Sequence, residues 1–326
     1  MQPFHEPVFC TQAPSQLDKR QWYRSAVPSI SVQTPYDPAP LMERLRRRIK
    51  TDRYRFAVFG DTHHSPALPD IIRLVREHGA DFVVTVGDLV DLGGGREGPE
   101  HYGRLAAEAG DFLRALPVWA ALGNHDVDSR WDYDHWNGVA NFKAFYNLQP
   151  YYSFDFRNAR FIFLSWMLPD ELELQWLELQ LKSAILPHIF VISHWPLLTH
   201  GAIAETGSEK WSEPVRALLA RRRVTALLSG HDHVYYRTVR DGVNCLLSAG
   251  VHNIMTVGNV AGKAARDSYY GRESQTGDYV FRSEKGERRW KEMQHLVVMI
   301  SVSGATVTGQ VLSTASELWE EFAFAG

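Results

Sequence analysis

Cysteine is scarce in this sequence, and its scarcity argues against several kinds of protein. The 326-residue chain has two cysteines, Cys10 and Cys245, which lie far apart and outside any metal-binding spacing. Neither a disulfide-stabilised fold nor a thiolate zinc site is therefore expected. Charge of one sign is also lacking, because 35 basic and 38 acidic residues give a formal net charge of −3. This balance gives no support to nucleic acid or an anionic membrane as a partner.

Long hydrophobic runs are missing as well. No segment approaches the roughly 18 apolar residues of a transmembrane helix. The first twenty residues contain three prolines and no apolar stretch of the kind found in signal peptides. We therefore expect a cytoplasmic protein. No G-x-G-x-x-G motif directly follows a predicted strand and no Walker loop occurs, so nothing indicates a nucleotide cofactor.

The dominant pattern is a set of five short apolar runs, each followed by polar side chains. Apolar runs of this length, bounded by turn residues, predict buried strands. The runs are 55–59, 82–86, 117–122, 189–193 and 225–229. The polar residues that follow them are Asp61, His63, Asp88, Asn124, His194, His231 and His233. Carboxylates, an amide and imidazoles at five strand ends predict a metal site.

The remaining pattern predicts one catalytic domain over residues 54–326, preceded by a proline-rich extension, residues 1–53, with a short helix near 41–50. Helices with one apolar face separate the first three strands, which is the signature of parallel βαβ units. The polar segment 253–291 is expected to be a long surface loop.

The spacing of the ligands favours two metal ions over one. In an extended strand, residues i and i+2 point to the same side, so we expect Asp61 with His63, and His231 with His233, to converge in pairs. Nitrogen and oxygen ligands suit Zn, Mn, Fe, Co or Ni better than Mg or Ca. Seven ligands exceed the needs of one open catalytic ion, whereas two ions sharing an Asp would each have four. The charge of two divalent ions would be offset by two Asp carboxylates and a bridging hydroxide. About one positive charge would then face a phosphoryl group.

These residues resemble, in order, the five-block signature of the calcineurin-like metallophosphoesterases. The matching blocks are Asp61-x-His63, Gly87-Asp88, Gly123-Asn124-His125, His194 and Gly230-His231-x-His233. The likeness spans residues 54 to about 250. It implies an α/β fold in which two mixed sheets pack face to face with helices outside, a four-layer α/β/β/α sandwich.

The resemblance also implies a role for each residue. The first metal would be held by Asp61, His63, Asp88 and His233. The second would be held by Asp88, Asn124, His194 and His231, with Asp88 as the bridge. His125 would donate to a phosphoryl oxygen or protonate the leaving group, or else make only a supporting hydrogen bond. Asp126 would orient His125.

One position departs from a branch of the family. Purple acid phosphatases carry a tyrosine three residues after the bridging Asp, where this chain has Asp91, so a coloured ferric site is not expected. Asp91 is either a turn residue or a partner of a metal ligand. His64 is expected to be structural. Six other residues could either contact substrate or simply pack within the protein. They are His200, His252, Trp131, Tyr133, Trp136 and Trp195.

The expected function is hydrolysis of a small-molecule phosphate ester, with metal-bridging hydroxide attacking phosphorus. A phosphomonoesterase is favoured, using two ions of Mn, Fe or Zn. The alternatives are a phosphodiesterase, including one for cyclic nucleotides, and a metal-binding scaffold without catalysis. A scaffold would use the extension and the 253–291 segment as partner surfaces. A nuclease ranks lower because it needs a basic groove, which the charge balance does not support.

Overall fold

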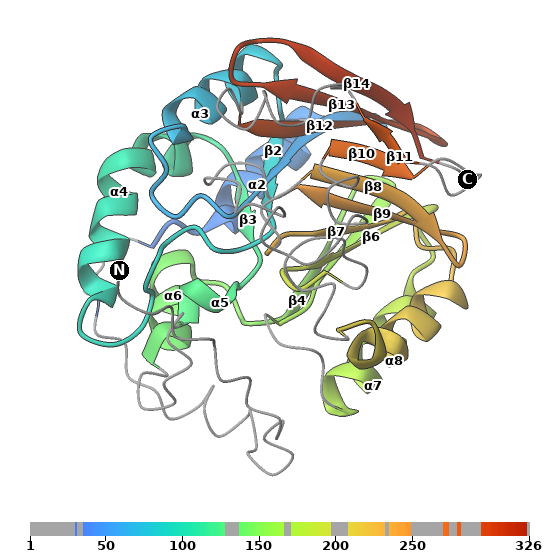
Figure 1. The fold of residues 1–326 in the computed structure, drawn as a ribbon, viewed down its shortest axis with the longest axis horizontal. Helices are drawn as coiled ribbons and strands as arrows, with labels where there is room; N and C mark the ends of the chain where they lie inside the picture. The colour runs from blue at the N-terminus through green and yellow to red at the C-terminus, as the bar shows by residue number, and fades with distance from the viewer. Residues whose placement is uncertain are drawn as a thin grey trace, which may run out of the picture.

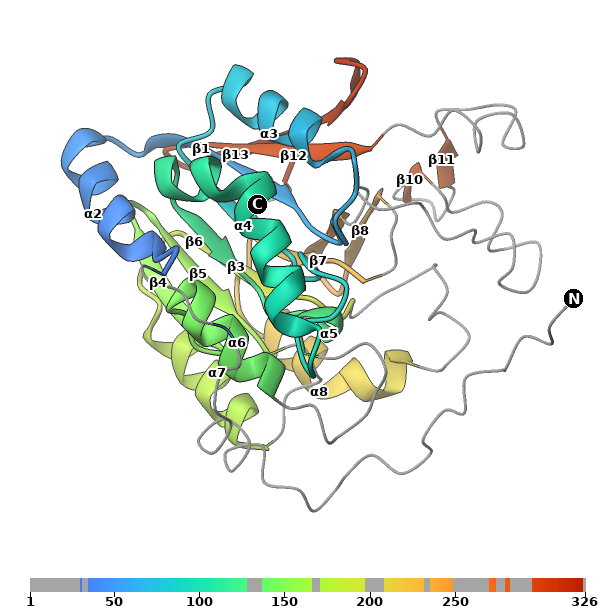
Figure 2. The same cartoon turned by 90° about the vertical axis from the view of Figure 1, so that its left-hand side faces the viewer.

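Two β-sheets face each other at the centre of the molecule, and helices cover their outer faces (Figure 1, Figure 2). The computed structural model describes residues 30, 35–127, 137–165, 171–196, 208–231, 235–248, 270–273, 279–281 and 295–324. The predicted α/β fold with two mixed sheets is confirmed. Within the described ranges, no helix combines the length and apolar character needed to cross a membrane.

The first sheet has six strands in the order β14-β13-β12-β1-β2-β3. Its strands are β1 (Arg53–Phe59), β2 (Phe82–Thr85), β3 (Val118–Ala120), β12 (Leu296–Ser303), β13 (Thr306–Ser313) and β14 (Leu318–Ala323). The three N-terminal strands run parallel, as βαβ units require, and the C-terminal strands add antiparallel. The carboxyl ends of β1, β2 and β3 therefore lie at one edge.

The second sheet has eight strands in the order β11-β10-β8-β9-β7-β6-β5-β4. Its strands are β4 (Tyr152–Phe156), β5 (Ala159–Phe163), β6 (His188–Ser193), β7 (Ala226–Ser229), β8 (Tyr235–Arg240), β9 (Val243–Ser248), β10 (Tyr270–Glu273) and β11 (Tyr279–Phe281). Strands β5, β6, β7 and β9 are parallel. The prediction of a loop over 253–291 was wrong where β10 and β11 occur. These strands, of four and three residues, are too short to leave a clear pattern.

Seven helices occur in the described part of the chain. They are α2 (Pro38–Arg48), α3 (Leu68–Glu77), α4 (Gly98–Ala115), α5 (Asn124–Val127), α6 (Asn137–Tyr146), α7 (Glu171–Ser183) and α8 (Ser208–Ala220). Helices α3 and α4 lie beside the first sheet, and α7 and α8 beside the second (Figure 1). Met42 and Leu45 of α2 belong to the main core, so this part of the 1–53 extension packs on the rest of the molecule. The boundary at residue 53 stays a prediction.

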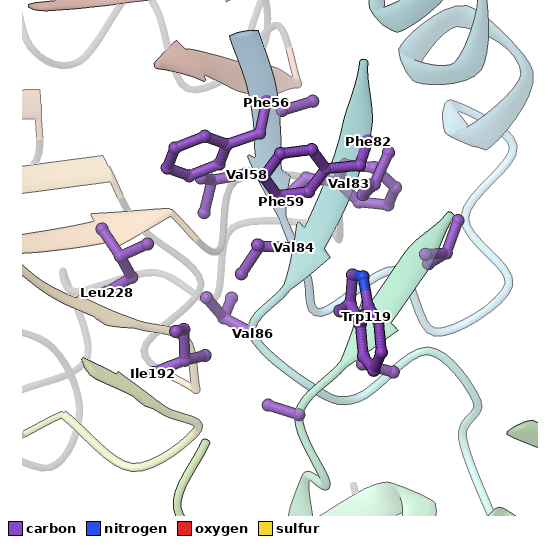
Figure 3. Close-up of a cluster of buried hydrophobic side chains, with 14 of the residues drawn as sticks. Phe56, Val58, Phe59, Phe82, Val83, Val84, Val86, Trp119, Ile192 and Leu228 are labelled. Carbon is purple, nitrogen blue, oxygen red and sulfur yellow. The ribbon is translucent and has the colours of Figure 1, made fainter. Parts of the chain in front are cut away.

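Alternating side chains of the central strands fill two separate cores. Phe190 and Ile192 of β6 point into the core between the sheets, whereas Ile189 and Val191 face the cluster under α7 and α8. Between the sheets, the rings of Phe56 and Phe82 stack with centroids 5.2 Å apart, and Figure 3 shows both side chains in this cluster. Burial of both strand faces explains why these strands are continuous apolar runs. It also fixes the strand ends that carry the candidate ligands.

Candidate metal centre

The loops after five parallel strands meet where the two sheets come together. One cross-sheet hydrogen bond runs from the backbone N–H of His231, after β7, to Asp61 Oδ1, after β1, at 2.9 Å. A second joins Nδ1 of His194, after β6, to the carbonyl oxygen of Val86, after β2, at 2.7 Å. Hydrogen bonds and close contacts of this kind bring together six of the seven predicted ligands. The seventh, His233, lies outside the described residues.

Asp88 lies at the centre of the cluster and is 1% exposed. Its Oδ1 accepts a hydrogen bond from the backbone N–H of His125 at 2.7 Å. Its Oδ2 lies 3.1 Å from Nε2 of His194 and 3.6 Å from Nε2 of His63, without a hydrogen bond of good geometry. A buried carboxylate oxygen between two imidazole nitrogens is the arrangement expected of a ligand that bridges two cations.

The position predicted for the second metal is a compact group of donor atoms. Nε2 of His194 lies 2.9 Å from Asn124 Oδ1 and 3.1 Å from Nδ1 of His231. The distance between Asn124 Oδ1 and His231 Nδ1 is 2.8 Å. Because Nδ1 of His194 donates to a backbone carbonyl, its Nε2 is the atom available to a metal. Together with Asp88, these atoms fit one transition-metal ion.

The position predicted for the first metal is supported by a carboxylate behind its histidine. Nδ1 of His63 lies 3.2 Å from Oδ1 of Asp91, whereas its Nε2 faces Asp88. An imidazole that donates to a carboxylate through one nitrogen and faces a metal with the other is common in metal sites. Of the two roles left open for Asp91, the structure therefore supports that of partner to a metal ligand. Asp61 is fully buried. Burial opposes protonation of His63, but the hydrogen bond to Asp91 and the charges of Asp88 and Asp61 outweigh it and raise the pKa of His63.

The backbone at the site differs from the extended form expected from sequence. Asp61, His63, Asp88 and His231 have φ angles of 53°, 42°, 54° and 74°. The prediction that i and i+2 converge because the chain is extended was therefore wrong for Asp61 and His63, whose side chains are aimed by left-handed turns. Such turns cost about 1–2 kcal/mol per non-glycine residue and are often retained at functional sites. Gly123 has a related role, because a Cβ there would overlap Asp88 Oδ1.

His125 and Asp126 do not interact as expected. The ring of His125 is held through Nδ1 by the carbonyl oxygen of Asp91 at 2.8 Å. The carboxylate of Asp126 instead accepts backbone N–H groups of Asp88, Leu89 and Gly123 at 2.9, 3.2 and 2.8 Å. Asp126 therefore ties the loop after β2 to the loop after β3. The interpretation of Asp126 as the partner of the His125 ring fails because backbone amides take up both of its oxygens.

The ring of His125 lies beside the first metal position. It meets the ring of His63 edge to face, with centroids 4.3 Å apart. Its ligand atom lies within 4.8 Å of those of His63 and Asp88. Chiefly through burial, the pKa of His125 is lowered. This position suits a group that contacts a substrate bound to the metals.

Trp195 lies against the cluster, whereas His64 points away from it. The indole of Trp195 stacks on the His231 ring at 4.4 Å, so it supports a candidate ligand. His64 is buried and turns away from Asp88 toward helix α4. The other residues with open roles, His200, His252, Trp131, Tyr133 and Trp136, lie outside the described residues.

The charged groups of the cluster shift one another's pKa values. Burial opposes ionisation of Asp88, but nearby imidazoles, His194 first, outweigh it and hold the pKa of Asp88 well below its usual value. Burial also opposes protonation of His194, yet the charge of Asp88 raises the pKa of His194 to about 9. The site thus favours a cation, and the donor set of one amide, carboxylates and imidazoles fits transition metals.

Comparison with known proteins agrees with this geometry. Residues 54–235 match the family model described as calcineurin-like phosphoesterase. Tartrate-resistant acid phosphatase type 5 of Mus musculus is 29% identical over 251 residues, covering 63% of this chain and 74% of the relative.

Solved structures share the fold at low sequence identity. GAP50, the anchor in the inner membrane complex of Plasmodium, has a TM-score of 0.58 and 16% identity, covering 84% of this chain and 89% of that one. A dimetal phosphatase from Danio rerio has a TM-score of 0.53 and 15% identity, covering 83% of this chain and 98% of that one.

Proposed function

Because the chain belongs to the calcineurin-like phosphoesterase family, we propose that it is a phosphomonoesterase that uses two metal ions. The observation that carries the proposal is the position of Asp88 Oδ2, between a histidine of the first sheet and a histidine of the second. A carboxylate there can be shared by two ions. The likeness to an acid phosphatase supports the monoester preference.

The donor atoms fit two ions of Mn, Fe or Zn. Asp61, His63 and Asp88, with His233 by resemblance, would hold one ion. Asp88, Asn124, His194 and His231 would hold the other. When bound, such a pair supplies an activated water at neutral pH and positive charge against the phosphoryl oxygens.

The remaining chemistry falls to residues of the chain itself. His125 lies within 4.8 Å of the ligand atoms of the first position, so its imidazole can meet a phosphoryl or leaving-group oxygen. Its Nδ1 is held by the Asp91 carbonyl, which leaves Nε2 for the substrate. A proton on Nε2 then requires the imidazolium form, which the negative charge of a phosphate monoester favours.

The test compares nitrophenyl phosphate with bis(nitrophenyl) phosphate. Metal-stripped protein is reloaded separately with Mn, Fe, Zn, Ni and Co, with Asp88→Asn as the inactive variant. The exposed Asp111, on helix α4, supplies the matched control Asp111→Asn. We expect metal-dependent turnover that prefers the monoester and falls by at least about 10²–10³-fold in Asp88→Asn.

The other outcomes each overturn part of the proposal. Preference for the diester would assign a phosphodiesterase and bring cyclic nucleotides forward as substrates. Protein that binds two ions but turns over neither ester, nor a panel of sugar and nucleotide monophosphates, would indicate the non-catalytic scaffold. Equal activity in Asp88→Asn and the parent would contradict the proposed role of Asp88 as the ligand shared by two ions.

We also propose a cytoplasmic location. The support is the scarcity of cysteine, since a chain with two cysteines suits a reducing compartment. Fractionation of cells that express the full chain tests this location, and recovery with membranes or in the medium would contradict it.

A further inference from the structure

A second cluster of metal-ligating side chains lies beside the proposed centre. His64 follows β1, Asp91 follows β2, and His101 lies in the first turns of helix α4. One ligand atom from each of the three residues lies within 4.8 Å of the other two. None of the three belongs to the set that resembles the family signature. His64 is buried, and the other two are partly exposed, so the cluster can be reached from solvent.

The orientation of His64 suits a metal ligand. Its Nδ1 lies 3.4 Å from Oε2 of Glu108, which can only accept when ionised, so Nδ1 carries the proton. The lone pair is then on Nε2, which faces Nδ1 of His101. Glu108 is held in turn by Nε of Arg104 at 2.7 Å. A carboxylate behind the histidine is the same support that Asp91 gives to His63.

The distance between the imidazole nitrogens of His64 and His101 can be compared with that of a histidine pair in the proposed centre. Nε2 of His64 lies 3.1 Å from Nδ1 of His101. The same distance, 3.1 Å, separates Nε2 of His194 from Nδ1 of His231 in the proposed centre. Two nitrogens bound to one tetrahedral zinc ion at 2.0–2.1 Å would lie about 3.3 Å apart. Both pairs are therefore spaced to share a cation.

The charges around the cluster also favour a cation. Asp91 and Glu108 contribute two negative charges, and Arg104 contributes one positive charge. With neutral imidazoles the net charge is about −1. Oδ1 of Asp91 is already engaged by Nδ1 of His63, so this carboxylate lies between the two clusters.

We propose that His64, Asp91 and His101 form a third metal site, for a transition-metal ion such as Zn²⁺. Three protein ligands leave the remaining coordination positions to water, as in other open sites. The site needs neither Asp88 nor His125, but it shares Asp91 with the first metal position, because Oδ1 of Asp91 lies 3.2 Å from Nδ1 of His63.

Metal stoichiometry of the full chain tests the proposal without any measurement of turnover. Metal-stripped protein is dialysed against buffered Zn²⁺, and bound zinc is measured by elemental analysis. We expect three equivalents for the parent and two for His101→Ala. The control is His78→Ala, which removes a partly exposed histidine at the end of helix α3 and should leave three equivalents.

A second variant separates this result from failure of the proposed function. Asp88→Asn should lose zinc from the central positions yet keep the equivalent that His101→Ala removes. A zinc count in His101→Ala that equals that of the parent would overturn the third site.

Crystals of the parent protein provide the check that needs no variant. With zinc present, anomalous scattering should show an ion between His64 Nε2 and His101 Nδ1. Ions at the central positions together with a bare hydrogen bond between His64 and His101 would refute the proposal.

Discussion

Oδ2 of Asp88 lies 3.1 Å from Nε2 of His194, so a carboxylate carried by one sheet contacts an imidazole carried by the other. The contact is fully buried, and its two partners have opposite pKa shifts. Each group perturbs the other because burial leaves their charges little screened.

Asp91 should set the metal affinity of the first position. Asp91→Ala removes the acceptor for Nδ1 of His63, so the affinity for the first ion should fall about 10–100-fold. The measurement is calorimetric titration in the His101→Ala background, where only the two central positions bind. Asp111→Ala is the control. An unchanged affinity would show that Asp91 is only a turn residue.

Metal uptake should depend on pH through His194. Its pKa of about 9 means that the metal-free protein carries a proton there at pH 7. A metal ion must displace this proton, so affinity should rise with pH, up to about tenfold per unit, until pH 9. Calorimetry in buffers of different ionisation enthalpy should show proton release at pH 7. Absence of release would contradict a protonated His194.

His125 should affect turnover without affecting metal content. Burial and the added charge of the metals both lower its pKa, so the imidazolium form is present only below the ordinary value of about 6.5. If its proton reaches the leaving group, kcat/KM, which reports the free enzyme, should fall as pH rises through that pKa. His125→Ala should lower kcat about 10²–10⁴-fold and flatten this limb. Loss of bound metal in the variant would point to a structural role instead.

Asp126 should contribute to stability even without metal. Asp126→Asn replaces one acceptor oxygen with an N–H₂ group that faces backbone donors. We expect a loss of about 2–3 kcal/mol in the free energy of unfolding. Urea denaturation in the presence of a chelator measures this loss apart from metal binding. Asp111→Asn should change stability little.

The aromatic layer between the sheets should be a major source of stability. Phe161 is fully buried, and its ring contacts those of Phe56 and Phe190 with centroids 5.3 and 5.1 Å away. Phe161→Ala should cost about 3–5 kcal/mol. The control is Leu179→Ala, at a side chain that is 63% exposed. Similar denaturation midpoints for both variants would contradict a packed layer here.

The strands and the positions of the candidate ligands could be predicted from sequence because both leave local patterns. Buried strands such as β2 and β6 are continuous apolar runs, and their ligands follow within a few residues. The turns that aim Asp61 and His63 could not be predicted, because a left-handed conformation of a non-glycine residue has no pattern of its own.

The surroundings of the centre were harder to predict for a different reason. His64 and His101 are 37 residues apart and meet only through the packing of α4 against the strand ends. The one available signal was that His101 and Glu108 are two helical turns apart and so share a face of α4. The partner of Asp126 was mistaken because sequence shows side chains, whereas its partners are backbone amides.

The division of the ligands between two sheets has a consequence for folding. Neither sheet alone carries a complete set, since Asp88 and Asn124 follow strands of one and His194 and His231 follow strands of the other. Tight metal binding therefore requires both halves to be docked in their final register. In a refolding experiment, tight metal binding should therefore occur last, after the two sheets have docked. The rate of metal binding would then report the rate at which native protein forms.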